Sequence, residues 1–196
     1  MHPELLSLSL FMLVTSCSPG PNNIVASYSG FNFGLVKTIP HMFGVIFGFT
    51  TLVIVMNFGL INIFKKFPIL QETLKYTGSI FLIYLAYKIA FSSIDNEEKV
   101  KKPVNFFDTF LFQFINPKGV MVAMIAVSTF IDVQNNYLRD ASIVIIAYFF
   151  VAVFSVSSWC LLGKYLRKFA TSENFIKKFN YTMSFLLIVC VIMFYV

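Results

Sequence analysis

The stretch Ser18-Pro19-Gly20-Pro21-Asn22-Asn23 interrupts a run from Leu5 to Val36 that contains no Asp, Glu, Lys or Arg. These 32 residues would form a helix of roughly 48 Å, whereas the hydrocarbon core of a bilayer is about 30 Å thick. The two prolines lack an amide hydrogen, and the glycine between them loosens the backbone. We therefore predict a helix that ends near Ser18 and restarts after Pro21, within the membrane.

The composition is that of a polytopic membrane protein. Of the 196 residues, 58% are hydrophobic and 12% are charged, whereas soluble domains have about 45 to 50% apolar and about 25% charged residues. The prediction is an all-α integral membrane protein in which residues 1–196 form one transmembrane domain. A spanning helix needs roughly 20 apolar residues, and six such segments are predicted: Leu5–Ala26, His41–Phe64, Ile69–Phe91, Thr109–Ile131, Ala141–Gly163 and Phe179–Val196.

The basic residues predict the orientation, because cytoplasmic loops are enriched in Lys and Arg. If both termini lie outside, ten basic residues are cytoplasmic (Lys37, Lys88, Lys99, Lys101, Lys102, Lys164, Arg167, Lys168, Lys177, Lys178). Four are then external: Lys65, Lys66, Lys75 and Arg139. The net charge of +6 is therefore explained by topology, and lysines scattered over short loops do not indicate nucleic-acid binding.

A second break is predicted in the fourth span, at Asn116-Pro117-Lys118. Asn is a favoured helix cap and Pro is favoured at the first helical position. A lysine at membrane depth marks a cavity or pathway, or it snorkels to the interface from a shorter segment.

Breaks in spans one and four of six indicate a duplicated unit of three spans, with repeats at about 1–95 and 104–196. A second copy of an odd-numbered unit enters the membrane from the opposite side, so the halves are predicted to be inverted repeats. Both restarting helices would point their amino termini at the centre. These termini and Lys118 favour an anionic group there, such as an α-carboxylate.

Catalytic chemistry is not indicated. The chain has two histidines, and no acidic pair lies within one predicted span. Three cysteines scattered over different spans match no metal-ligand spacing, so neither a metal nor a cofactor is predicted.

Two further features have competing interpretations. Gly44 and Gly48 form a small-xxx-small pattern that permits close helix packing, and its simplest use is backbone packing within the monomer. His41 stands at the predicted start of the second span, where it is either a solvated cap or a carrier of a coupled proton.

The segment "SPGPNNIVASYSGFNFGLVKTIPHMFGVIFGF" resembles the signature region of the LysE/RhtB family of bacterial amino-acid exporters, and "FQFINPKGVMVAM" resembles the family's second motif. The resemblance covers essentially the whole chain, although the predicted sixth span is short. It implies a homodimeric inner-membrane exporter of amino acids or close derivatives, driven by the proton gradient. The motif positions carried over are Ser18, Pro19, Gly20, Pro21, Asn22, Asn23, Gly44, Gly48, Asn116, Pro117 and Lys118.

We therefore expect an amino-acid efflux carrier that works by alternating access. The prolines and Gly20 would interrupt the first helix, Asn22, Asn23 and Asn116 would supply polar contacts, and Lys118 would orient the carboxylate. A small-ion exporter or channel is one alternative, and a non-transporting membrane scaffold is another. The sequence does not specify which amino acid is carried.

Overall fold

The computed structural model describes residues 5–91, 103–132 and 134–195. Helices make up 88% of this part of the chain, which has no strands. The elements are α1 (Leu5–Cys17), α2 (Pro21–Val55), the π-helical segment η1 (Met56–Leu60), α3 (Ile61–Lys66), α4 (Pro68–Ala90), α5 (Phe106–Ile115), α6 (Pro117–Phe130), α7 (Tyr137–Arg167) and α8 (Glu173–Met193). The all-α prediction is confirmed. Lys99, Lys101 and Lys102, which entered the orientation argument, lie outside the described residues.

Both predicted breaks are present. Gly20 precedes α2 with an extended backbone (φ −162°, ψ 170°), and Pro21 is the first residue of that helix. Asn116 is likewise extended (φ −78°, ψ 105°) before Pro117, the first residue of α6. A proline disfavours the helical conformation of the preceding residue, so each helix ends before its proline and a new one begins there. The axes of α5 and α6 differ by 61°.

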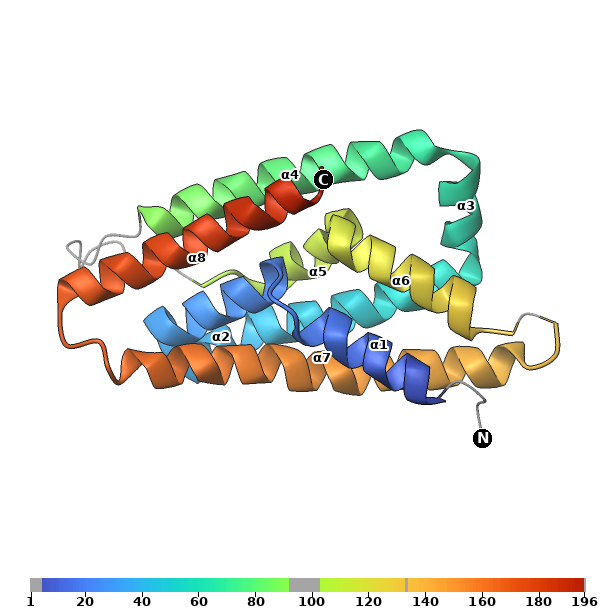
Figure 1. Ribbon diagram of the computed structural model, residues 1–196, viewed down its shortest axis with the longest axis horizontal. Coiled ribbons are helices and arrows are strands. Elements are labelled where there is room, and N and C mark those ends of the chain that lie inside the picture. Colours follow the sequence, from blue (N-terminus) through green and yellow to red (C-terminus); the bar gives the residue numbers. More distant parts are fainter. Residues whose placement is uncertain (1–4, 92–102, 133, 196) are drawn as a thin grey trace.

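Gly34 divides α2 into two helices that run back along each other. Its φ of 79° is in the left-handed region, which glycine adopts without steric cost. The Thr38 hydroxyl donates to Ser29 Oγ at 3.0 Å, and His41 Nε2 lies 3.2 Å from the carbonyl oxygen of Asn22. Residues 21–33 and 35–55 are therefore neighbours, and Figure 1 shows the chain reversing between them. The prediction that the second span starts at His41 is wrong, because a single glycine makes the turn.

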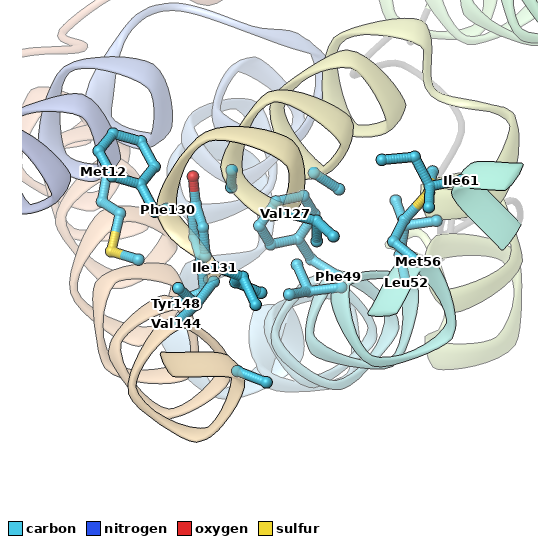
Figure 2. Close-up of a cluster of buried hydrophobic side chains, with 14 of the residues drawn as sticks. Met12, Phe49, Leu52, Met56, Ile61, Val127, Phe130, Ile131, Val144 and Tyr148 are labelled. Carbon is cyan, nitrogen blue, oxygen red and sulfur yellow. The ribbon is translucent and has the colours of Figure 1, made fainter. Parts of the chain in front are cut away.

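The helices pack in layers (Figure 1). Helix α4 lies beside α8, and α7 extends along the opposite side against α2. A side chain at Gly30 or Gly163 would collide with the α7 carbonyl of Cys160 or the α2 carbonyl of Ser27, so these glycines permit the close approach of α2 and α7. Figure 2 shows the largest core, where side chains of α1, α2, α6 and α7 converge around Val127 and Tyr148.

The exterior suits a lipid environment. Three helical stretches are long and apolar enough to cross a membrane, namely Pro21–Lys66, within which Gly34 reverses the chain, Tyr137–Arg167 and Glu173–Met193. The bent pair of α5 and α6 adds a fourth. Whether the chain has six spans, and whether they form an inverted 3+3 repeat, stays a prediction.

The last helix is longer than predicted. It begins at Glu173 instead of Phe179, because the Ser172 hydroxyl accepts a hydrogen bond from Phe175 N at 3.3 Å and caps it. At its other end, the Tyr195 hydroxyl lies 3.1 Å from Ser79 Oγ, within the middle turns of α4.

Candidate functional site

The two helix breaks meet, although they are about 100 residues apart in the sequence. The Lys118 ammonium donates to Ser18 Oγ at 2.8 Å, and it lies 3.4 Å and 3.5 Å from the carbonyl oxygens of Ser18 and Pro19. The second residue of α6 thus reaches the carboxyl end of α1. A cation suits this end, because the last carbonyls of a helix carry partial negative charge.

The free carbonyls at the end of α1 are bound by side chains from other elements. The last four carbonyls of a helix have no partner within it, and in a membrane the protein itself must supply one. Asn23 Nδ2 donates to Ser16 O at 2.7 Å and to Ser18 O at 3.1 Å. Helix α7 supplies two more donors: Ser155 Oγ to Ser16 O at 2.7 Å, and Trp159 Nε1 to Cys17 O at 3.1 Å. The break is therefore built into the protein interior.

A second polar cluster joins α2 to α5. The side-chain amides of Asn22 and Gln113 donate to each other, at 2.8 Å and 3.1 Å. Gln113 is fully buried and also donates to Thr109 O at 2.8 Å. Sequence reasoning missed Gln113, although a glutamine inside an apolar span is a signal of the same kind as Asn22.

His41 belongs to this cluster. Its side chain is 2% exposed, so the interpretation as a solvated cap is wrong. The reason is the reversal at Gly34, which begins the helix earlier and places His41 between Asn22 and α5. Its Nδ1 lies 3.0 Å from the Thr109 hydroxyl and its Nε2 faces the Asn22 carbonyl.

The hydrogen-bond partners of His41 define two protonation states. Nε2 faces a carbonyl, so it carries a hydrogen in both. The Thr109 hydroxyl has one hydrogen, and it lies 2.9 Å from Asn105 O as well as near Nδ1. If Nδ1 is protonated, it donates to Thr109, which donates to Asn105. If Nδ1 is unprotonated, Thr109 turns its hydrogen toward the ring and releases Asn105.

A cavity of about 70 Å³ lies between the two breaks. Its polar lining includes Ser16, Asn22, Asn23, Asn116, Lys118 and Ser155. Among the described lining residues, Lys118 is the one side chain charged at neutral pH. The cavity therefore suits a small group with negative charge.

Asn116 occupies the cap position before α6, as predicted, but its side chain makes no cap hydrogen bond. The residue is 2% exposed, and its Oδ1 is buried without a hydrogen-bond partner in the described part of the protein. A buried oxygen without a hydrogen-bond partner is unusual, because nearly all buried polar atoms are paired. The side chain lines the cavity, where a ligand can supply the missing partner.

Both restarting helices leave amides free at the cavity. Neither α2 nor α6 has a side-chain cap within the described structure, and each begins with a proline that has no amide hydrogen. The amides of Asn22 and Asn23 in α2, and of Lys118 and Gly119 in α6, are among the amino-terminal groups that have no partner within a helix. Such groups bind anions.

The other predicted residues lie around this centre. Gly44 and Gly48 pack against α5, where an added methyl group would meet Thr109 and Phe110. They and His41 lie outside the cavity lining. Gly20 lies against Lys118, since an added Cβ would be 2.8 Å from Nζ.

Comparison with known proteins identifies relatives over the whole chain. Residues 13–196 match the sequence model of the family described as "LysE type translocator". A cysteine/O-acetylserine efflux protein from Salmonella choleraesuis (strain SC-B67) is 28% identical over 193 residues, which are 98% of each chain. A protein of the same name from Escherichia coli (strain K12) is 27% identical over 193 residues, again 98% of each chain. No solved structure matches.

Proposed function

The chain belongs to the LysE-type translocator family, and we propose that this membrane transporter exports an amino acid or a close derivative across the bacterial inner membrane. The relatives are named as efflux proteins for cysteine and O-acetylserine, which are an amino acid and an amino-acid derivative. The family is one of translocators, so the protein is not an enzyme.

The observation that carries the proposal is the meeting of the two helix breaks at Lys118. In this proposal, the substrate carboxylate binds the ammonium and the free amides at the starts of α2 and α6. The ammonium makes one short bond, to Ser18 Oγ, and two contacts of 3.4 Å and 3.5 Å to carbonyls. A carboxylate can replace the two long contacts, because charge-assisted hydrogen bonds are shorter and stronger.

Asn116 is the proposed partner of the substrate's ammonium group. Its unpaired Oδ1 is an acceptor, and Asn116 is among the residues that line the cavity. A zwitterion would thus be held between a cation and an acceptor on the same helix start. In this arrangement Asn22 and Asn23 hold the broken backbone in place through Gln113, Ser16 and Ser18.

The carrier would work by alternating access between two inverted repeats of three spans. The halves have the same order of elements, which supports the proposal. A broken span comes first (α1 with residues 21–33 of α2, and α5 with α6), followed by a long helix (residues 35–55 of α2, and α7). The last long helix of each half is α4 or α8, and in the first half η1 and α3 precede it. In such a carrier the site lies where the broken helices meet. We propose both termini outside, as the basic residues predict, and a homodimer, as the family resemblance implies.

His41 is the proposed carrier of a coupled proton. Its protonation at Nδ1 decides whether Thr109 donates to Asn105 or to the ring, and its Nε2 holds the carbonyl of Asn22. A proton at His41 therefore changes the hydrogen bonds at the start of α5, while the bond from Nε2 to the carbonyl of Asn22 in the broken first span is kept.

Efflux from cells loaded by dipeptide feeding tests the proposal. All amino acids in the medium would be measured for wild type, Lys118→Met, a Pro19→Ala/Pro21→Ala double variant, and an empty vector. Lys177→Met is the matched control, because Lys177 is exposed on α8. We expect wild type and the control to release at least one amino acid, and the site variants to release none above vector. Equal release by Lys118→Met would remove the lysine from the site, and no release by wild type would contradict the proposed function.

A further inference from the structure

A larger cavity adjoins the polar one. It has a volume of about 460 Å³ and lies between α1, α6 and the end of α8. The two cavities share five lining residues: Thr15, Gly20, Pro21, Lys118 and Val122. Lys118 therefore borders both, with the small polar cavity on one side and the large cavity on the other.

The lining of the large cavity is apolar away from this junction. It is made by Phe11, Met121, Ile125, Cys190, Met193 and Phe194. No Asp or Glu is among the described residues that line either cavity, and Lys118 supplies their one positive charge. A cationic side chain would meet Lys118 without a counter-ion, and an anionic one would be buried among apolar groups. Both are costly at membrane depth.

We infer that this large cavity receives the side chain of the transported amino acid, and that the substrate is an amino acid with an uncharged, apolar side chain, such as leucine, methionine or phenylalanine. The inference rests on the proposed function, and it follows because the large cavity shares Lys118 with the small polar cavity. A carboxylate bound at Lys118 stands at the entrance of the cavity, so the side chain on the neighbouring carbon atom extends into the apolar space.

The size of the cavity agrees with this class. Sites for small molecules measure about 300 to 1,000 Å³, and an apolar cavity of about 150 Å³ is enough to hold benzene. A three-carbon amino acid would leave most of 460 Å³ unfilled. A branched or aromatic side chain gains more apolar contact there, so larger apolar residues should be preferred.

The competing occupant is a lipid chain, because the cavity opens to the surface beside Met121 and Met193, which are 60% and 70% exposed. A lipid-filled crevice would have no influence on which amino acid is exported. The selectivity of export among amino acids therefore distinguishes a cavity filled by lipid from one that receives the substrate side chain.

A substitution that fills the large cavity with a bulky side chain tests the inference. Cys190 is buried in the wall of the cavity, so Cys190→Phe would occupy the space. Ile192→Phe is the matched control, since Ile192 is on the same helix, is 56% exposed and lines neither cavity. Cells would be fed alanyl-leucine, which delivers both amino acids inside in equal amounts, and release of each would be compared with an empty vector.

We expect wild type and Ile192→Phe to release leucine in preference to alanine. In Cys190→Phe the leucine-to-alanine ratio should fall at least tenfold while alanine release continues, which a merely misfolded protein cannot produce. If Cys190→Phe does not reach the membrane, Ile125→Phe fills the cavity from α6 and replaces it. With alanyl-lysine, release of lysine should equal that of the vector.

An unchanged leucine-to-alanine ratio in the filled variant would overturn the inference in favour of a lipid crevice. Release of lysine, or of alanine without leucine, by wild type would overturn it while leaving the proposed export function intact. Release of no amino acid at all would contradict the proposed function itself.

Discussion

The paired amides of Asn22 and Gln113 offer a quantitative test of how the broken span is held. Their two hydrogen bonds, at 2.8 Å and 3.1 Å, join α2 to α5. Replacement of either residue by Leu leaves its partner without these bonds, whereas replacement of both leaves two apolar side chains of similar size. Removing one partner of a buried pair costs more than removing both. The effects of the single substitutions should therefore add to more than the effect of the double one.

The expected coupling free energy follows from the number of bonds. Interhelical hydrogen bonds in membrane proteins average about 0.6 kcal/mol in double-mutant cycles, so two of them give about 1.2 kcal/mol. This corresponds to about a sevenfold change in the unfolding equilibrium constant. The assay is reversible unfolding in mixed micelles for wild type, Asn22→Leu, Gln113→Leu and the double variant. Free energies that add to within about 0.4 kcal/mol, the range for independent sites, would refute the reasoning.

Three further perturbations test separate parts of the account. Gly34→Ala should lower the free energy of unfolding by about 1 to 3 kcal/mol, because φ 79° with ψ 175° is a conformation adopted almost only by glycine. No atom lies within 4 Å of the added methyl group, so the cost is backbone strain alone, and a stability equal to wild type would exclude this conformation at residue 34. Gly163→Ala should lower the free energy of unfolding by about 1 to 3 kcal/mol and reduce the folded fraction on size-exclusion chromatography in detergent, because the methyl group would collide with Ser27 O. The control Gly119→Ala, whose added methyl group has its nearest contact at 3.5 Å, should behave like wild type, and equal elution of both variants would refute the close crossing of α2 and α7. His41→Gln should flatten the dependence of export on external pH, because glutamine holds hydrogen bonds without titrating. A pH profile like that of wild type would remove His41 from proton coupling.

The breaks could be predicted from the sequence because their causes are local. Pro21 and Pro117 constrain the residues that precede them, and no distant contact is needed to end α1 or α5. The depth of Lys118 in the apolar pattern likewise predicted that this lysine lies at a cavity or pathway, and its functional role stays a prediction. These predictions depend on short-range sterics and on the cost of polar groups in lipid.

The remaining features depend on contacts between distant segments. Gly34 gave no clear signal, since a glycine in an apolar run is as compatible with a helix as with a turn. The partner of Lys118 could not be read either, because Ser18 and Pro19 are about 100 residues away. Gln113 and Thr109 became relevant only when α5 was placed against residues 22 and 41. The large apolar cavity is formed by three helices whose faces the hydropathy pattern does not assign.

The central claim is that Lys118 binds the carboxylate of the transported amino acid. The most direct measurement is counterflow in proteoliposomes, in which the exported amino acid and its carboxamide compete with labelled substrate for wild type and for Lys118→Met. A hydrogen bond to a charged group contributes about 1.5 to 3 kcal/mol, so wild type should prefer the acid roughly 10- to 150-fold, and the variant should bind acid and amide alike. A variant that keeps the full preference for the acid would contradict the account.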